Sequence, residues 1–455
     1  MHASQVKTHD DVRAIIAERN ITQVKVGVYD IDGMMRGKYM STSKFLSSLD
    51  GGFGFCDVVL GWDIDDQMYD NTTLTGWQNG YADAMVRILP DTCREMPTEP
   101  DVLFWQAEFS GHLESLCPRG ILRNVIERCR AMGFEPYAGV EYEFLVADEC
   151  HDDLIVKDYL NIKPLGVGNA GYSVLRNSVN TDFYKELLGV CAAMNMPLEG
   201  LHEETGPGQL EAALTVDQAL IAADNAALFK TFAKIVAQKQ NRVMSFMAKW
   251  HRDFSGQGGH IHMSLKKLDG STAFFDETDE FRMSGTMRHF VGGMQALTPQ
   301  LMALAAPTIN SYSRLVPGYW APTTATWGVD NRTVGFRVIK GSAKSQRVEF
   351  RVPGADTNPY LAMAAALIGG LYGIEHAIEP SAPVTGNGYA IEPPEHLKLP
   401  RSLWQAAQNL RASAAAREWL GDDFVDHYAA TREWEEREFQ RHVTDWERRR
   451  YFELI

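Results

Sequence analysis

The sequence predicts an α+β protein that combines long helices with a sheet of polar strands, for three reasons. The chain has 455 residues, 45% of them hydrophobic, which is enough for a large core and more than one domain. Strand-like segments alternate with long helical segments and show no internal repeat. Certain strand-like segments place two polar residues around one apolar residue. These segments are Glu141-Tyr142-Glu143, Gln209-Leu210-Glu211, His260-Ile261-His262 and Glu349-Phe350-Arg351.

Residues 10–110 are expected to form a small N-terminal α+β domain. Apolar residues at helical spacing predict its helix, and period-two alternation before a glycine turn predicts a hairpin. The predicted elements are a helix over Asp10–Asn20, a strand at Val24–Val28, a turn at Asp32-Gly33, and strands over Phe53–Leu60 and Ala84–Ile88.

Residues 116–455 are expected to form the second, larger domain. Pro118 opens a predicted helix that ends at Gly133, because proline favours the first helical turn and glycine follows the last. Further helices are predicted over Thr181–Met194, Val216–Gln238 and much of Trp404–Ile455, the last with Trp434, Phe439 and Trp446 buried.

Composition excludes several classes of partner. The formal net charge of −15 argues against nucleic acid and anionic membranes, which need a basic surface. No apolar run reaches the roughly 18 residues of a membrane-spanning helix, and the polar N-terminus does not resemble a signal peptide. The six cysteines form no C-x-x-C pair and are expected to be reduced thiols. These features predict a cytoplasmic protein.

The paired polar residues predict a shared interior that binds cations. Residues two apart on a strand share a face, so each segment directs both polar groups the same way. A single segment of this kind is more often a strand with a solvated face. Several together supply carboxylate and imidazole groups, and carboxylates are costly to bury together unless a metal ion or arginine neutralises them. We therefore expect a barrel with a polar, metal-binding interior.

A set of stretches in fixed order carries a family resemblance: Gly139–Phe144, His202-Glu203 with Gly208–Glu211, Gly259–Ser264, Asn310–Tyr319, Asn331-Arg332 and Arg347–Arg351. Through them the chain resembles the glutamine synthetase superfamily, class I type, over nearly its whole length. The resemblance implies a β-grasp-like N-terminal domain, a catalytic domain with an incomplete antiparallel barrel, and a dodecamer of two hexameric rings with active sites between neighbouring subunits.

This resemblance also implies a set of ligands and a reaction. Two or more Mg²⁺ or Mn²⁺ ions are expected per subunit, with ATP as co-substrate. Glutamate's side-chain carboxylate would attack the γ-phosphorus of ATP, and an amine would displace phosphate from the resulting acyl phosphate. The implied residues are Glu143, Glu203 and Glu211 for one metal ion; Glu141, His260 and Glu349 for another; Arg314, Arg351, Gly256 and Trp320 for substrate; and His262, Ser264, Arg332, Arg337 and Arg347 for nucleotide. Arg332, Trp320 and Asp57 are the implied catalytic residues.

Two departures from glutamine synthetases concern the acceptor. Trp320 stands where they carry a glutamate that binds and deprotonates ammonium, and an indole cannot accept a proton. Asp57, the candidate base, persists, but Val59 and Leu60 replace the serines near it. A surface of this kind suits an alkyl chain or alkylammonium better than ammonium. The sequence thus resembles the branch that joins glutamate to primary amines, including γ-glutamylpolyamine and γ-glutamyl-monoamide synthetases.

Two other functions remain open, and so does the amine. The chain could be a true glutamine synthetase with a rebuilt ammonium site, or a non-catalytic relative with a structural or regulatory role. A polyamine would need acidic groups for its distal ammonium, which Asp63, Asp65 and Asp66 could supply if they are not simply a solvated loop. Trp320 and Leu60 favour an alkyl monoamine instead.

Overall fold

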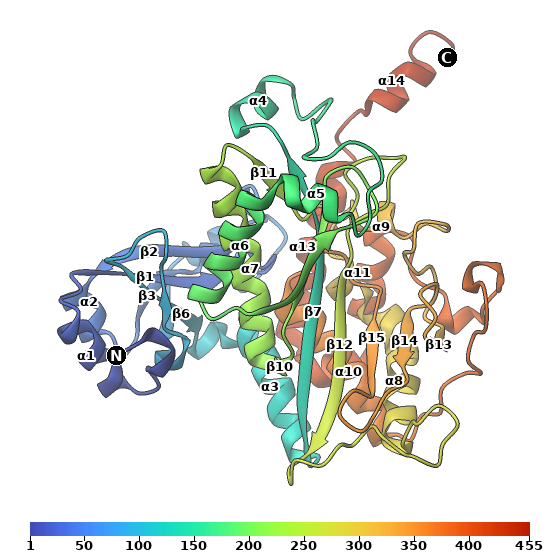
Figure 1. The fold of residues 1–455 in the computed structure, drawn as a ribbon, viewed down its shortest axis with the longest axis horizontal. Helices are drawn as coiled ribbons and strands as arrows, with labels where there is room; N and C mark the ends of the chain where they lie inside the picture. Colours follow the sequence, from blue (N-terminus) through green and yellow to red (C-terminus); the bar gives the residue numbers. More distant parts are fainter.

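The computed structural model describes residues 1–455 and contains two sheets with helices packed against them (Figure 1). The first sheet has the strand order β2-β1-β6-β4-β3, with β5 beside β6. Its pairs are antiparallel except β1 with β6. The strands are β1 (Gln23–Tyr29), β2 (Met35–Ser41), β3 (Phe53–Cys56), β4 (Asp83–Ile88), β5 (Arg94–Glu95) and β6 (Leu103–Phe109).

Local sequence explains the N-terminal elements. Helix α1 (His9–Glu18) begins after Thr8, whose side chain accepts a hydrogen bond from the backbone N–H of Asp11, and its apolar stripe is buried. The predicted hairpin joins β1 to β2, with Gly33 at φ +80° in the turn. Helix α2 (Thr42–Ser47) follows β2. The strand predicted over Phe53–Leu60 is too long, because residues 57–60 form a 3₁₀ turn and only β3 pairs with β4.

The second sheet is curled and open. Its order is β13-β14-β15-β12-β7-β9-β8, with β10 and β11 beside β7, and its edge strands β13 and β8 do not pair. Only β13 and β14 run parallel. This arrangement confirms the predicted α+β fold with an incomplete barrel. The strands are β7 (Phe134–Ala147), β8 (Leu198–Glu203), β9 (Gln209–Leu214), β10 (Asp217–Gln218), β11 (Val243–Ser245), β12 (Gly259–Lys267), β13 (Trp327–Val329), β14 (Phe336–Ile339) and β15 (Arg347–Phe350).

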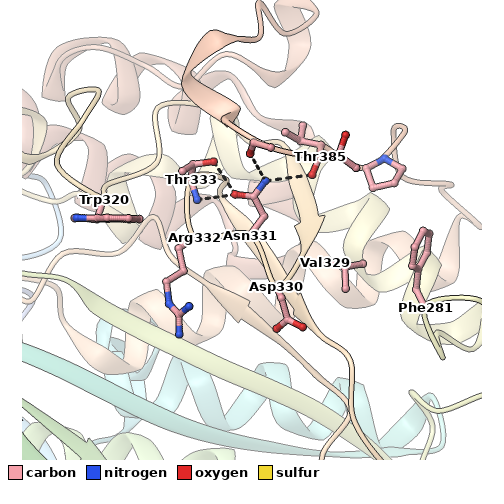
Figure 2. Close-up of a pocket in the computed structure, with 11 residues that line it drawn as sticks. Phe281, Trp320, Val329, Asp330, Asn331, Arg332, Thr333 and Thr385 are labelled. Carbon is pink, nitrogen blue, oxygen red and sulfur yellow. Dashed lines mark hydrogen bonds between the residues drawn. The ribbon is translucent and has the colours of Figure 1, made fainter.

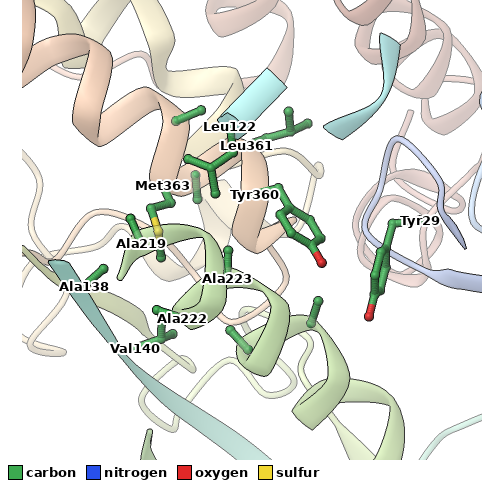
Figure 3. Close-up of a cluster of buried hydrophobic side chains, with 14 of the residues drawn as sticks. Tyr29, Leu122, Ala138, Val140, Ala219, Ala222, Ala223, Tyr360, Leu361 and Met363 are labelled. Atoms are coloured by element: carbon green, nitrogen blue, oxygen red, sulfur yellow. The ribbon is translucent and has the colours of Figure 1, made fainter. Parts of the chain in front are cut away.

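Long helices cover one face of this sheet. Ala138 and Val140 of β7 lie in a buried apolar cluster with small residues of α7 and apolar residues of α10 (Figure 3). Residues 141 and 143 alternate with these along β7, so their side chains point to the opposite face, which is the barrel interior. The cluster continues to the first sheet, where the rings of Tyr29 and Tyr360 are 5.2 Å apart. The main helices are α3 (Pro118–Ala131), α6 (Thr181–Ala193), α7 (Ala219–Lys239), α8 (Gly285–Ala305) and α10 (Pro359–Glu375).

Most helix predictions are close to the structure, with one clear error near the C-terminus. Helix α7 starts later than predicted because Asp217 and Gln218 pair with β7. Trp434 is buried as predicted, but Phe439 and Trp446 are 45% and 61% exposed. They lie where α13 ends and α14 extends away from the body, so no core is within reach (Figure 1). The remaining helices are α4 (His151–Val156), α5 (Val174–Val179), α9 (Ser311–Arg314), α11 (Leu403–Ala412), α12 (Ala414–Leu420), α13 (Asp422–Phe439) and α14 (Asp445–Tyr451).

Buried polar contacts join the N-terminal sheet to the rest of the chain. Arg432 of α13 is fully buried, and its Nη1 lies 2.8 Å from Oδ1 of Asp32 in the β1–β2 turn. The side-chain amide of Asn358 donates to the carbonyl of Ile31 in the same turn, at 3.1 Å. None of the helices has the length and apolar character needed to cross a bilayer.

Candidate active site

A polar cavity of about 480 Å³, here called the main cavity, lies inside the open barrel. Strand pairing explains its composition, because His260 lies opposite Glu141 and Glu211 lies opposite Glu143 in the sheet. Cross-strand partners share a face, so these side chains converge. The predicted site residues that line it are Glu141, Glu143, Glu211, His260, Glu349, Gly256, Arg314, Trp320, Arg332, Arg337 and Arg351.

The imidazoles and carboxylates are within ligand distance of one another. His260 Nδ1 lies 3.5 Å from Glu349 Oε1 and 3.7 Å from Glu141 Oε2, and His262 Nε2 lies 3.0 Å from Glu141 Oε1. Burial opposes ionisation of Glu141, but the two histidines outweigh it and hold the pKa of Glu141 below its usual value. Burial and the nearby Glu211 raise the pKa of Glu143 despite the opposing His260. The group therefore carries charge that a cation would stabilise.

The prediction for Glu203 is not supported by its position. Glu203 faces Leu210 across the β8–β9 pair, is buried, and accepts a hydrogen bond from the hydroxyl of Tyr184 at 3.1 Å. Its neighbour Glu204 lines the main cavity instead.

Glu204 belongs to a second candidate metal group, which the sequence interpretation missed. Candidate ligand atoms of His202, Glu204 and Glu211 lie within 4.8 Å of one another. A hydrogen bond that His202 donates to the carboxylate of Glu211 raises the pKa of His202 to about 9. The sequence does not show the pairing register of β8 against β9. Because His202 pairs with Glu211, alternation along β8 directs Glu203 to the other face of the sheet.

Arginines form a further part of the wall of the main cavity. Burial of Glu349 disfavours its charge, but Arg351 outweighs this and lowers the pKa of Glu349. Arg337 Nη1 donates to Glu349 at 3.1 Å. Arg314 is buried and donates to the carbonyls of Val352 and Arg351, at 2.8 and 3.1 Å. These contacts fix planar cationic groups that suit carboxylate or phosphate oxygens.

Gly256 is needed for this packing. A Cβ at Gly256 would lie 2.7 Å from Cγ of Arg314, so a larger residue would displace the arginine. The predicted nucleotide residues lie beside the main cavity, with Arg347 Nε 3.2 Å from Nδ1 of His262 on the neighbouring strand. Ser264 is on the same face of β12 as His262 but does not line the main cavity.

The predicted base Asp57 does not line the main cavity of its own chain. It is 1% exposed, and its carboxylate lies 3.4 Å from the side-chain amide of Asn79. Burial raises the pKa of Asp57. The acidic residues considered for a polyamine also lie elsewhere: Asp63 accepts backbone N–H bonds within its own turn, and Asp66 pairs with Arg36 at 2.6 Å.

Trp320 lines both the main cavity and a second, open cavity of about 480 Å³, here called the side pocket (Figure 2). The side pocket is lined by residues 329–333 and 383–386 with Phe281, and it shares Trp320 and Arg332 with the main cavity. Trp320 is 59% exposed and has φ +60°, and Arg332 makes no hydrogen bond or ion pair within the chain.

The donor set fits hard divalent cations. It consists of several carboxylates and a few imidazoles, the ligand types that suit Mg²⁺ and particularly Mn²⁺. An open barrel with clustered carboxylates and arginines is the arrangement expected of an enzyme that uses metal ions and anionic substrates.

Comparison with known proteins identifies the family. The family model "Glutamine synthetase, catalytic domain" matches residues 115–451. Type-1 glutamine synthetase 2 of Dictyostelium discoideum is 45% identical over 95% of this chain and 84% of its own length. Glutamate–isopropylamine ligase of Pseudomonas sp. is 37% identical over 98% of both chains. A gamma-glutamylethanolamide synthetase of Streptomyces coelicolor is 34% identical over 98% of this chain and 96% of its own.

A solved structure shows the same fold. "Apo GmaS without ligand" has a TM-score of 0.84 and 26% identity, and covers 97% of this chain and 99% of its own. The chain belongs to the glutamine synthetase family, as the sequence resemblance predicted, and is a ligase of that family. Family members use ATP and divalent metal ions, with glutamate and an amine or ammonia as substrates.

Proposed function

We propose that this protein joins L-glutamate to an organic primary amine, a monoamine or a polyamine, forming a γ-glutamyl amide with hydrolysis of ATP to ADP and phosphate. The observation that supports this acceptor is Trp320, an exposed indole at the wall of the main cavity where a proton-accepting carboxylate would serve ammonium. Two relatives with amine-ligase names, the isopropylamine and ethanolamide enzymes, agree with it.

The chain's own residues account for the first step. Arg314 and Arg351 hold the glutamate, and Arg332, Arg337 and Arg347, with His262 and Ser264, hold the nucleotide. The γ-carboxylate oxygen then attacks the γ-phosphorus, and ADP leaves. When bound by the glutamates and His260, divalent metal ions supply neutralising charge for the transferring group. Arg332 has no other partner and is free to contact that group.

In the second step the amine nitrogen attacks the acyl carbon, and phosphate leaves with the oxygen it has gained. The amine arrives protonated, since alkylammonium pKa values are near that of lysine, about 10.4. Asp57 is the candidate base, with phosphate oxygens of the acyl phosphate as the alternative acceptor. Trp320 would exclude water from the acyl phosphate and contact the carbon chain of the amine.

Asp57 can act as the base only if it enters the active site of a neighbouring subunit. We propose the family's dodecamer of two hexameric rings, with Asp57 of one subunit entering the site of its neighbour. The buried position of Asp57 in a single chain requires a local rearrangement for this role. Light scattering on active enzyme tests the assembly, since full activity of a monomer would exclude a base from a neighbour.

The relative from Dictyostelium favours a second candidate, a true glutamine synthetase using ammonium. Phosphate release with ATP, glutamate, Mg²⁺ and a panel of amines separates the two. We expect kcat/KM for at least one primary amine to exceed that for ammonium. A preference for ammonium over every amine would overturn the proposal, and no turnover with any acceptor would indicate a non-catalytic protein.

A further inference from the structure

The side pocket is an unassigned cavity that opens beside the reaction site. It adjoins the main cavity at Trp320 and Arg332, whose side chains line both cavities. In Figure 2 they lie at one end of the side pocket and Phe281 lies at the other. A molecule reacting in the main cavity can therefore extend into the side pocket along the indole and the guanidinium.

The wall of the side pocket is suited to an uncharged carbon chain. Phe281, Trp320, Val329 and Val384 line it with apolar surface. Its volume of about 480 Å³ is in the range of small-molecule sites.

The polar groups of the wall are largely paired with one another. The amide of Asn331 donates to the carbonyls of Val384 and Gly386 at 3.2 and 2.9 Å, and its oxygen accepts from Thr333 (Figure 2). The carboxylate of Asp330 lies 3.4 Å from Nη2 of Arg337. Asp330 is the one carboxylate of the wall, and it is engaged with Arg337 through one oxygen, while Arg332 adds positive charge beside it.

Backbone conformation supports a functional role for the shared wall. Trp320 and Asp330 both have positive φ, +60° and +48°, which is uncommon for non-glycine residues and concentrates at functional sites. Arg351 donates to the carbonyl of Trp320 at 3.3 Å, and the hydroxyl of Tyr389 donates to that of Ala321 at 3.1 Å. The backbone that carries the indole is thereby fixed where the two cavities meet.

We propose that the side pocket receives the carbon chain of the acceptor amine, and that the acceptor it selects is an apolar primary monoamine several carbons long. This inference rests on the proposed function and specifies its substrate class. The amino group lies in the main cavity while the chain passes along Trp320 into the side pocket. Each methylene that enters apolar surroundings should raise kcat/KM about fourfold.

The test measures kcat/KM by phosphate release for straight-chain amines from methylamine to hexylamine, and for 1,6-diaminohexane. Thr385→Trp fills the side pocket from an exposed loop position, and Val329→Phe fills it from β13. Ala382→Trp adds the same bulk at an exposed neighbouring position that does not line the pocket, and serves as the matched control.

We expect the ratio of hexylamine to methylamine kcat/KM to fall at least about tenfold in both filled variants and to stay at the wild-type value in Ala382→Trp. An unchanged ratio in both filled variants overturns the assignment of the side pocket. Continued turnover with amines in that case leaves the proposed function in place. Preference for the diamine over hexylamine overturns the monoamine assignment. Turnover with ammonium alone overturns the proposed function itself.

Discussion

Exchanging Glu204 for glutamine should weaken binding of Mg²⁺ or Mn²⁺, whereas the same exchange at Glu203 should leave it intact. Glu204 lies with His202 and Glu211 in a group whose ligand atoms are within 4.8 Å of one another. Glu203 points into the protein and bonds Tyr184, a contact that a glutamine side chain can preserve. The two substitutions are chemically identical and one residue apart, so each is the control for the other.

The size of the effect follows from ligand loss. Losing even an outer hydrogen-bonding partner of a metal ligand weakens affinity about 10- to 100-fold, so loss of a ligand should reach at least that range. At a metal concentration 100 times the wild-type Kd, wild-type protein gains about 2.7 kcal/mol of stability. A variant with 100-fold weaker binding gains about 0.4 kcal/mol under the same conditions.

Urea unfolding with and without metal measures this difference, and calorimetric titration gives the Kd directly. We expect Glu203→Gln to keep the full metal-dependent gain and Glu204→Gln to lose most of it. The reverse outcome would refute the register argument and restore Glu203 as the ligand.

Three further predictions concern the acceptor, a buried charge group and pH. Trp320→Glu should lower the preference for a three-carbon amine over ammonium, measured as the ratio of their kcat/KM values, by about 10- to 70-fold. This is the effect expected from two or three methylenes that are no longer buried against the indole. An unchanged ratio would show that the indole does not contact the amine. Glu349→Gln should lower the free energy of unfolding by about 3–5 kcal/mol, because it leaves Arg351 and Arg337 without their buried carboxylate, and a loss below about 1 kcal/mol in urea would contradict this. Burial lowers the pKa of Lys230 to about 7, so between pH 7 and 10 the unfolded chain binds more protons there and stability rises with pH. Lys230→Met should remove this rise, up to about 1.4 kcal/mol per pH unit, and parallel stability curves for the two proteins would argue against it.

Sequence reasoning recovered features that depend on local pattern. The helix near Asp10–Asn20, the proline that opens α3 and the turn at Gly33 are set by residues within a few positions of one another. The convergence of Glu141 and Glu143 follows from alternation along a single strand.

Features that depend on distant pairing were harder to predict. Choosing between Glu203 and Glu204 required the register of β8 against β9, which no residue near them specifies. Phe439 has the spacing of a buried residue, but burial requires a surface to pack against, and α13 has left the core by that point. The side pocket escaped notice because it joins residues near 281, 330 and 384 that share no sequence pattern.

The ion pair between Arg432 and Asp32 limits how the gene can be divided. A fragment of residues 115–451, the part that the family model matches, would retain every residue lining both cavities. It would also lack Asp32, the nearest carboxylate to the Arg432 guanidinium, and would keep only Glu435 at 3.8 Å; breaking a buried ion pair costs about 3–5 kcal/mol against a typical total stability of about 5–15 kcal/mol. Neither this fragment nor a chimera with another N-terminal sheet should express as a stable minimal enzyme unless position 432 is redesigned with it. Residues remote from the active site thus require the two sheets to be exchanged or retained together.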